Sequence, residues 1–400
     1  DGVFDSTGGM IRTSRNIFRT PPPVIYGLEA SLPLGEKGLV DARRVVITGI
    51  GVLAPNGIGV EDFWSALLEG RSGIGPITLF DAEEHDVGIA GEVSGFDPGR
   101  HIPFPVKSSR IGRNALLAIA AAAAALRHSG LDPENFRHNG ERFPVFSGVS
   151  ISPMDIIERG TGQMARKGPN KVSPYIVSAG QTNAVASAVS EHLGVQPART
   201  LSTACAAGLD VVHAAAESIR AGECDAALAG GADAPVTPFT VGCFGRTGMV
   251  PGGRGEEASR SCPFDRRRAG GIMAEGAAYF VLESLVHALA RGVAPLGEIL
   301  GWGTCHDRPG EEAGYGYPHA MSAALHESGM APEQIDYICA HAPSDVVLDR
   351  RETEAIKQVF GPAAYSIPVS SIKGAVGNPL AAAGPLEITA CLKAFKDGKV

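Results

Sequence analysis

The sequence contains no C-x-x-C pair, few aromatic residues and no apolar run of the length that crosses a bilayer. Its seven cysteines also lack the histidine spacing typical of zinc sites, which argues against a structural metal and against a disulfide framework. Unpaired cysteines suit a reducing compartment, so we expect the protein in the cytoplasm.

Two further classes of protein are disfavoured by the absence of long apolar or basic runs. The most apolar stretch, at 116–126, covers about half of the roughly 20 residues that a transmembrane helix needs, and arginines flank it. It predicts a buried helix and no membrane span. The net charge of -8 and the shortness of the longest basic run, at 266–268, give no support for nucleic-acid binding.

Glycine is abundant, with 52 residues, beside 44% hydrophobic and only 6% aromatic residues. This balance is typical of an Ala/Gly-rich α/β protein with tight turns between strands and helices. Residues 1–42 include three consecutive prolines and show no sustained periodicity, so we expect a linker or leader that is poorly ordered. The ordered chain should begin near residue 43.

Strand and helix patterns then alternate in two series that divide near Arg291. The first series predicts strands at 44–48, 143–149, 197–201 and 226–229, with a helix at 208–219. The second predicts strands at 296–301, 335–340 and 367–370, with helices at 320–328 and 352–359. We therefore expect a layered α/β protein with an N-terminal half over 43–290 and a C-terminal half over 291–400.

The first strand ends in a glycine-containing turn at 49–51 that nearly matches a dinucleotide-binding fingerprint. Pro55, Asn56 and Gly57 follow, where the phosphate-binding helix of such a site would continue. Nicotinamide binding is therefore not expected.

Cys205 lies between the predicted strand at 197–201 and the predicted helix at 208–219. Unpaired amides and the dipole at a helix N-terminus favour a thiolate and stabilise an oxyanion, so this position suits a nucleophile. A free cysteine is more often a small buried apolar residue, and for Cys205 taken alone that alternative stays open.

Two other polar segments follow predicted strands, at His341 and in the loop from Lys373 to Asn378. Functional groups of α/β proteins gather at the carboxyl ends of strands, so these side chains and Cys205 are candidates for one pocket. Taken singly, His341 could be a structural histidine and Lys373 a solvated surface lysine.

Several motifs together resemble those of the β-ketoacyl-acyl-carrier-protein synthases. The match runs from about Arg44 to Val400, and its most specific segments are 45–51, 203–208, 263–265, 275–277 and Lys373-Gly374 with Gly384. The resemblance implies a thiolase-like five-layer α/β/α/β/α sandwich of two pseudo-equivalent halves. It also implies a homodimer, or a heterodimer with another ketosynthase-like subunit.

The resemblance further implies a 3-oxoacyl-[acyl-carrier-protein] synthase-like acyltransferase of fatty-acid or polyketide synthesis. Cys205 would accept an acyl group from an acyl carrier protein, and malonyl-carrier would decarboxylate and attack the resulting thioester. His341 matches the first catalytic histidine, Lys373 the active-site lysine, and Asn378 the position of the usual second histidine. No resident cofactor is implied, because the phosphopantetheine arm belongs to the carrier protein.

Acidic residues follow His341 at positions where the family also carries them, Asp349 and Glu352. A helix N-terminus, which favours carboxylates, explains them equally well.

Other positions depart from the family pattern near the donor side of the site. Pro343 stands where the family has a residue that offers a hydroxyl and an amide donor. Asp345 carries a charge that would repel a malonyl carboxylate unless its side chain points away. Gly271 stands where the family often has a phenylalanine. These departures leave two alternatives open. One is a relative that transfers or hydrolyses acyl groups without condensation, and the other is a non-catalytic partner resembling a chain-length factor, which the intact Cys205 motif disfavours.

The sequence ends at Val400, before the closing strands of the family and the glycine-rich phenylalanine loop among them. We expect the C-terminal half to lack its final strands, and a fragment is the simpler explanation.

Overall fold

The computed structural model describes residues 43–134, 143–253 and 261–400. The predicted linker or leader at 1–42 lies outside the described residues. A mixed seven-stranded sheet forms the centre, in the order β2-β1-β8-β7-β5-β6 with β9 also paired to β1. Its strands are β1 (Val45–Ala54), β2 (Gly57–Ile58), β5 (Val145–Gly148), β6 (Ala198–Leu201), β7 (Ala226–Asp233), β8 (Gly276–Ser284) and β9 (Gly297–Ile299).

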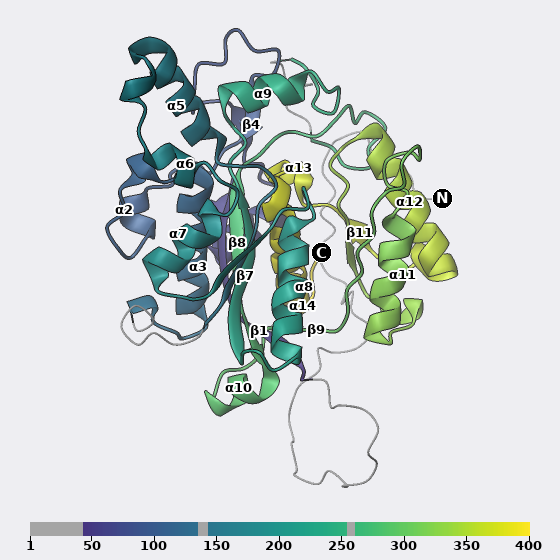
Figure 1. Ribbon diagram of the computed structural model, residues 1–400. Coiled ribbons are helices and arrows are strands. Elements are labelled where there is room, and N and C mark those ends of the chain that lie inside the picture. The colour runs from purple at the N-terminus through teal and green to yellow at the C-terminus, as the bar shows by residue number, and fades with distance from the viewer. Residues whose placement is uncertain (1–42, 135–142, 254–260) are drawn as a thin grey trace.

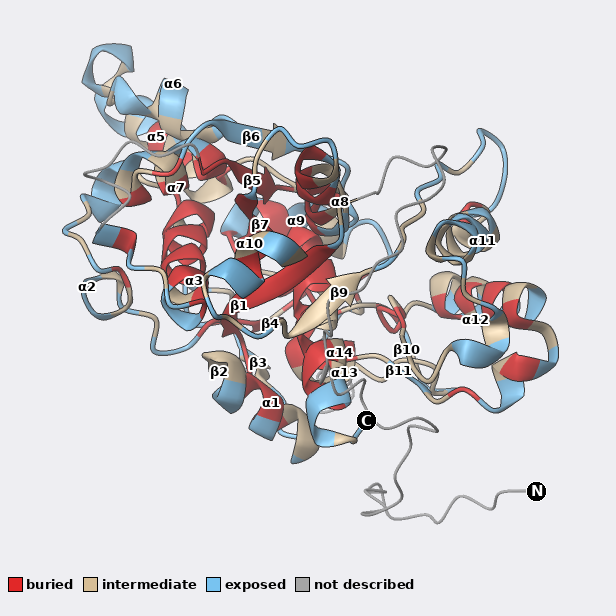
Figure 2. Cartoon of the chain, turned by 90° about the horizontal axis from the view of Figure 1, so that it is seen from below, coloured by how far each residue is buried: buried red, intermediate tan, exposed pale blue. Residues whose placement is uncertain are grey.

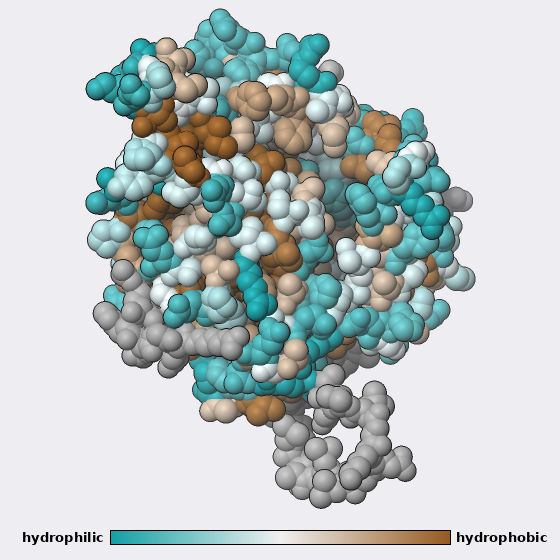
Figure 3. Space-filling view, viewed as in Figure 1, coloured by the Kyte–Doolittle hydropathy of each residue, from teal (hydrophilic) through white to brown (hydrophobic). Residues whose placement is uncertain are grey.

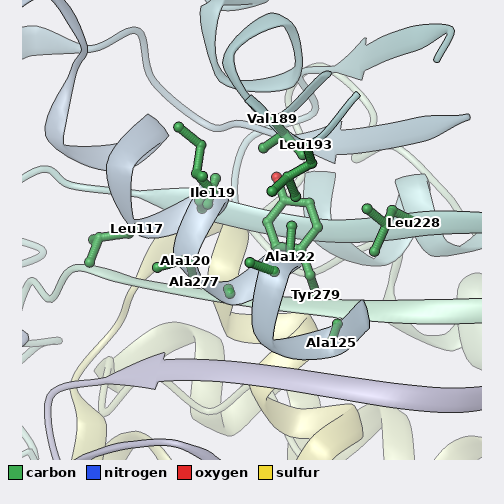
Figure 4. Packing of buried hydrophobic residues seen from close by; sticks show 14 of the residues in the cluster. Leu117, Ile119, Ala120, Ala122, Ala125, Val189, Leu193, Leu228, Ala277 and Tyr279 are labelled. Carbon is green, nitrogen blue, oxygen red and sulfur yellow. The ribbon is translucent and has the colours of Figure 1, made fainter. Parts of the chain in front are cut away.

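Helices cover both faces of this sheet and bury it. On one face, α3 (Arg113–His128) and α7 (Ala184–Leu193) pack on the sheet, and Figure 4 shows Leu117 and Ile119 of α3 in the cluster that contains Tyr279 of β8. On the other, α8 (Ala207–Arg220) and α14 (Ala383–Asp397) pack on β1, β7 and β8. The buried centre is the continuous red region of Figure 2. Because both faces are covered, the central strands β1, β5, β7 and β8 are buried along their whole length.

The second half adds two further layers beyond α8 and α14 (Figure 1). The parallel strands β10 (Ile338–Cys339) and β11 (Val369–Ser370) form a small sheet, and α11 (Tyr317–Ser328) and α12 (Val346–Phe360) lie outside it. The layers therefore run helix, sheet, helix, sheet, helix, which confirms the predicted sandwich. The strand predicted at 296–301 forms as β9 but pairs with β1, so it joins the first sheet.

The remaining elements surround this framework. They are α1 (Val60–Leu68), α2 (Pro98–His101), α5 (Met154–Lys167), α6 (Tyr175–Ala179), α9 (Pro238–Gly245), α10 (Leu285–Ala290), α13 (Lys373–Val376), β3 (Ile74–Pro76), β4 (Ile89–Gly91) and short 3-10 turns that include η5 (Leu380–Ala382). Over the described ranges, no helix is long and apolar enough to cross a membrane.

The predicted turn at 49–51 is wrong, because β1 continues to Ala54 with only a register shift between Ile47 and Gly49. The two glycines serve helix packing instead. A Cβ added at Gly49 would lie 2.2 Å from the Ala125 carbonyl oxygen, and one at Gly51 would lie 1.9 Å from that of Ala121. The alanine-rich helix α3 therefore sits directly on the β1 backbone, which accounts for the near match to a nucleotide fingerprint.

Gly51→Ala should destabilise the protein by about 3 kcal/mol, because the added methyl group collides with the α3 backbone. Gly75→Ala is the matched control, since a Cβ at this strand position meets nothing within 4 Å, and its effect should stay within about 0.5 kcal/mol. Chemical denaturation of both variants measures the difference. Equal midpoints would contradict the close packing of α3 on β1.

Candidate active site

Cys205 lies in a sharp turn between β6 and α8. Ala204 just before it has a φ of +53°, and α8 begins at Ala207, so the thiol stands two residues before the first helical residue. Gly208 permits a close contact here, because an added Cβ would lie 2.0 Å from the Ala381 carbonyl oxygen. The predicted placement of Cys205 between a strand and a helix is therefore confirmed.

The other predicted residues come from two segments of the second half. His341 follows β10, Lys373 begins α13, and Asn378 follows α13. The backbone of Asn378 is fixed against 272–274, with its N–H 2.7 Å from the Ile272 oxygen and its carbonyl 3.1 Å from the Ala274 nitrogen. Figure 1 shows α13 at the end of α8, between the two sheets.

The structure brings these four side chains together. The Asn378 side chain hydrogen-bonds the Cys205 thiol, and the Lys373 ammonium acts electrostatically on both Cys205 and His341. Ser371 ties the two strand ends to each other, since its hydroxyl donates to the Ala342 carbonyl at 3.0 Å. The Cys205 thiol therefore lies near the Asn378 amide and the Lys373 ammonium group, and the His341 imidazole lies near the same ammonium group.

Burial raises the pKa of the Cys205 thiol, whereas Lys373 and the hydrogen bond from Asn378 lower it. A nearby carboxylate, Asp233, raises it further. The position before α8 was expected to favour a thiolate, but loss of hydration outweighs the groups that oppose it. The resting nucleophile is therefore a thiol, which must lose its proton as it attacks.

His341 is a neutral imidazole at physiological pH. Desolvation by the surrounding protein and the charge of Lys373 lower its pKa to about 3. A neutral imidazole offers one N–H donor and one acceptor nitrogen. His341 therefore suits a role as a hydrogen-bond donor that carries no charge of its own.

Glu352 of α12 holds the backbone around His341. Its two oxygens accept the N–H groups of His341 at 2.8 Å and Ala342 at 2.7 Å. Burial raises the pKa of this carboxyl group to about 7. Glu352 therefore links α12 to the strand end that carries the imidazole.

Lys373 is buried, with a side chain only 1% exposed, and forms an ion pair with Glu387 of α14. A buried ammonium group without such a partner would cost several kcal/mol. Reasoning from the sequence missed Glu387, because its position within a helix gives no local indication of a partner across the site.

The departures from the family pattern have structural explanations. The Asp345 carboxylate caps α12, accepting the N–H groups of Val347 and Leu348 at 2.8 Å each. The negative charge of Asp345 thus interacts with the N-terminus of α12. Gly271 and Pro343 are in contact, since a Cβ at Gly271 would lie 2.9 Å from the Pro343 oxygen. A phenylalanine at 271 would therefore require this backbone to move.

Asp349 also has a structural task. It is 1% exposed and accepts the N–H groups of Phe264 at 2.8 Å and Asp345 at 3.1 Å, which joins the segment 263–265 to α12. Over the described ranges, no three His, Cys, Asp or Glu residues gather as metal ligands would.

Comparison with protein families matches residues 42–288 to the N-terminal domain of the β-ketoacyl synthases and residues 296–400 to their C-terminal domain. A 3-oxoacyl-[acyl-carrier-protein] synthase 2 of Coxiella burnetii is 37% identical, over 90% of this chain and 87% of that protein. A tetracenomycin polyketide synthase ketoacyl synthase alpha subunit of Streptomyces glaucescens is 36% identical, over 90% of this chain and 86% of that protein.

Solved structures show the same architecture. The ishigamide ketosynthase/chain length factor superimposes with a TM-score of 0.80 at 35% identity, covering 88% of this chain and 86% of its own. A β-ketoacyl synthase from Burkholderia phymatum superimposes with a TM-score of 0.79 at 30% identity, covering 89% of this chain and 86% of its own.

Glu352→Gln should make stability less dependent on pH. Because burial raises the pKa of Glu352 to about 7, the folded protein holds a proton that the unfolded chain releases above about pH 4.5. The wild type therefore loses stability as pH rises to 7, and the variant does not share this loss. The free energy of unfolding of the variant relative to wild type should rise by on the order of 2 kcal/mol over this window.

Urea denaturation at pH 4.5 and pH 7 measures this change. Comparing the two pH values cancels the constant cost of replacing one acceptor oxygen by an NH2 group. Glu354→Gln, at an exposed carboxylate on the same helix, is the control. A similar change in both variants would show that Glu352 is not the cause.

Proposed function

The chain belongs to the β-ketoacyl synthase family and is a condensing acyltransferase of this type, and on that premise we propose which residues perform the reaction. Cys205 carries the acyl group, His341 and Asn378 bind the thioester oxygen of the extender unit, and Lys373 orders the polar side of the pocket. The observation that supports this assignment is that Asn378 and Lys373 both act on the Cys205 thiol and that Lys373 also acts on His341.

In the first half-reaction, the sulfur of Cys205 attacks the carbonyl carbon of an acyl-carrier thioester. The carrier's thiol leaves, and the proton lost by Cys205 goes to that thiol in the net reaction. Lys373 and the Asn378 amide stabilise negative charge on the attacking sulfur, because both lower the pKa of the Cys205 thiol. The tetrahedral oxyanion requires amide donors of the kind found at a helix N-terminus.

In the second half-reaction, malonyl-carrier loses carbon dioxide and leaves an enolate at its thioester carbonyl. The enolate carbon attacks the acyl group and the carbon–sulfur bond to Cys205 breaks, so that a β-ketoacyl-carrier forms. The sulfur leaves as a thiolate and takes up a proton from solvent. His341 donates an N–H to the enolate oxygen, and its low pKa keeps it neutral in this role. The Asn378 NH2 group serves as the second donor.

Acyl transfer or hydrolysis without condensation is the alternative that the departures motivated. Asp345 no longer argues for it, because its carboxylate caps α12. The contact between Gly271 and Pro343 still does, since a phenylalanine at 271 would not fit unless the Pro343 backbone moved. Carbon dioxide released from malonyl-carrier at a rate that depends on His341 would rule this alternative out. A non-catalytic partner subunit is disfavoured by the assembled site.

The substrate carrier is proposed to be an acyl carrier protein. A related solved structure is a type II polyketide synthase acyl-carrier protein in complex with its ketosynthase bound to the hexaketide. Arg246 and the arginines at 266–268 are candidates to meet an acidic carrier, and binding should then weaken as salt rises. A reaction that depends on a free Cys205 thiol also fits a reducing cytoplasm.

We further propose a homodimer that forms across β6. Within the described ranges this strand lies at the edge of the sheet, pairs with β5 alone and is largely exposed, which leaves backbone groups available for a partner. Val177 is 73% exposed and Tyr175 46%, both on α6, and Figure 3 shows apolar side chains gathered below α5 on this face.

Light scattering of the purified protein should give twice the mass of one chain. A stable monomer would contradict the homodimer, and so would assembly only with a different subunit.

Cys205→Ala should abolish covalent uptake of an acyl group from acyl-carrier protein while leaving the circular-dichroism spectrum unchanged, because alanine keeps the turn and removes the nucleophile. Intact-mass measurement checks this. Cys243→Ala, at an exposed cysteine, is the control and should load like wild type. Equal loading of the Cys205 variant would eliminate Cys205 as the acyl carrier.

Asn378→Ala should lower the condensation rate by about 100 to 1,000-fold, because one donor to the enolate oxygen is lost. Acyl loading should fall much less, since Cys205 remains and Lys373 still acts on it. Single-turnover assays of the two half-reactions separate these effects. Equal losses in both would mean that Asn378 acts only on Cys205 and not on the extender unit.

A further inference from the structure

Asp233, the last residue of β7, is fully buried at the carboxyl end of a central strand. Its carboxylate accepts three backbone N–H groups. One oxygen accepts those of Ser150 and Ala381, both at 2.9 Å, and the other accepts that of Ile151 at 3.3 Å. These bonds join the end of β7 to the loop after β5 and to η5, three segments that are far apart in the sequence.

Two glycines allow η5, the segment that Asp233 holds, to pack closely against its neighbours. A Cβ added at Gly231 would lie 2.1 Å from the Ala381 carbonyl oxygen, and one at Gly208 would lie 2.0 Å from the same atom. Ala381 therefore lies directly on β7 and on the first turn of α8. Because Asn378 lies three residues before Ala381, the position of η5 determines where the Asn378 amide meets Cys205.

The negative charge of Asp233 also raises the pKa of the Cys205 thiol. In the described part of the chain Asp233 forms no ion pair, and the titratable groups that face it are Cys205 and the Tyr279 hydroxyl of β8. Cys205 in turn faces Lys373, Asp233 and Tyr317. Lys373 favours the thiolate and Asp233 opposes it. Without a cation paired to it in the described ranges, the Asp233 carboxylate is stabilised by its three backbone N–H bonds, and its charge acts on the Cys205 thiol.

We propose that Asp233 is a positioning residue of the active site, whose buried carboxylate fixes the segment carrying Asn378 against α8 through three backbone N–H bonds and places a negative charge close to Cys205. This deepens the proposed function, on which it rests only in taking Cys205 as the nucleophile. The carboxylate adds to the loss of hydration that keeps the resting thiol protonated, and the three N–H bonds hold the segment that carries the Asn378 amide.

The effect on pH dependence has a definite sign. Burial raises the pKa of Asp233 to about 7, so the carboxylate forms as the pH rises through neutrality. Once formed, it disfavours the Cys205 thiolate. In the wild type, the reactivity of Cys205 should therefore rise in two steps between pH 6 and pH 10, because the two groups titrate as a coupled pair.

Asp233→Asn is the test, because an amide has nearly the same shape and can keep the two N–H bonds of Ser150 and Ala381 on its oxygen. The rate of alkylation of Cys205 by iodoacetamide is measured from pH 6 to pH 10, with the labelled peptide identified by mass spectrometry. The variant should show a single step at lower pH, with a rate at pH 8 at least about threefold above wild type.

Asp155→Asn is the matched control, since burial also raises the pKa of that carboxyl group but it does not face Cys205. Its alkylation profile should coincide with wild type. An Asp233→Asn profile that also coincides with wild type, with only a lower melting temperature, would overturn the proposal in favour of a purely structural role. If Asp233→Asn does not fold, the wild-type profile decides, and a single one-proton step overturns the proposal.

This experiment is independent of acyl transfer. A protein that alkylates as expected and yet takes up no acyl group would leave the role of Asp233 intact while refuting the proposed function. If the wild type takes up acyl groups but wild type and Asp233→Asn have the same alkylation profile, the proposed function stands and the role of Asp233 is refuted.

Discussion

The buried positive charge of Lys373 is the interaction on which the rest of the site depends. Its ion pair with Glu387 holds it in place, and its field acts on two neighbours with opposite chemical results. It lowers the pKa of the Cys205 thiol, which favours the nucleophilic form, and it lowers the pKa of His341, which keeps the imidazole neutral. One fixed cation thus supports the thiolate of one residue and excludes the cationic form of another.

Burial opposes the effect of Lys373 on the pKa of Cys205 and adds to its effect on the pKa of His341. The Cys205 thiol stays protonated because loss of hydration outweighs Lys373 and Asn378, while His341 loses its charge to both influences together. The resting site therefore holds a neutral thiol and a neutral imidazole beside the Lys373–Glu387 ion pair. Such an arrangement suits a reaction in which charge appears only transiently, first on a sulfur and then on an enolate oxygen.

Local patterns in the sequence predicted the parts of this structure that local physics controls. The helix at 116–126 follows from its apolar run, and the turn at Cys205 follows from a strand and an amphipathic helix on either side. The segments that carry His341, Lys373 and Asn378 were found because strand ends are where side chains of different strands meet.

Tertiary contacts decided the rest. The glycines of β1 were read as a turn, because nothing local shows that α3 would lie within 2 Å of a Cβ there. Asp345 was placed near the substrate, because the helix that it caps was predicted to begin at 352 and in fact begins at Val346. Asp233 also stood at a strand end and was overlooked, whereas Glu387 offered no local signal.

The most direct test of the account follows the wild-type protein through both half-reactions. The protein is loaded with an acyl-carrier thioester and weighed by mass spectrometry, and malonyl-carrier is then added. The account predicts an acyl adduct that disappears with release of one equivalent of carbon dioxide and formation of a β-ketoacyl-carrier. An adduct that persists, or that yields only the free acid without carbon dioxide, would contradict it.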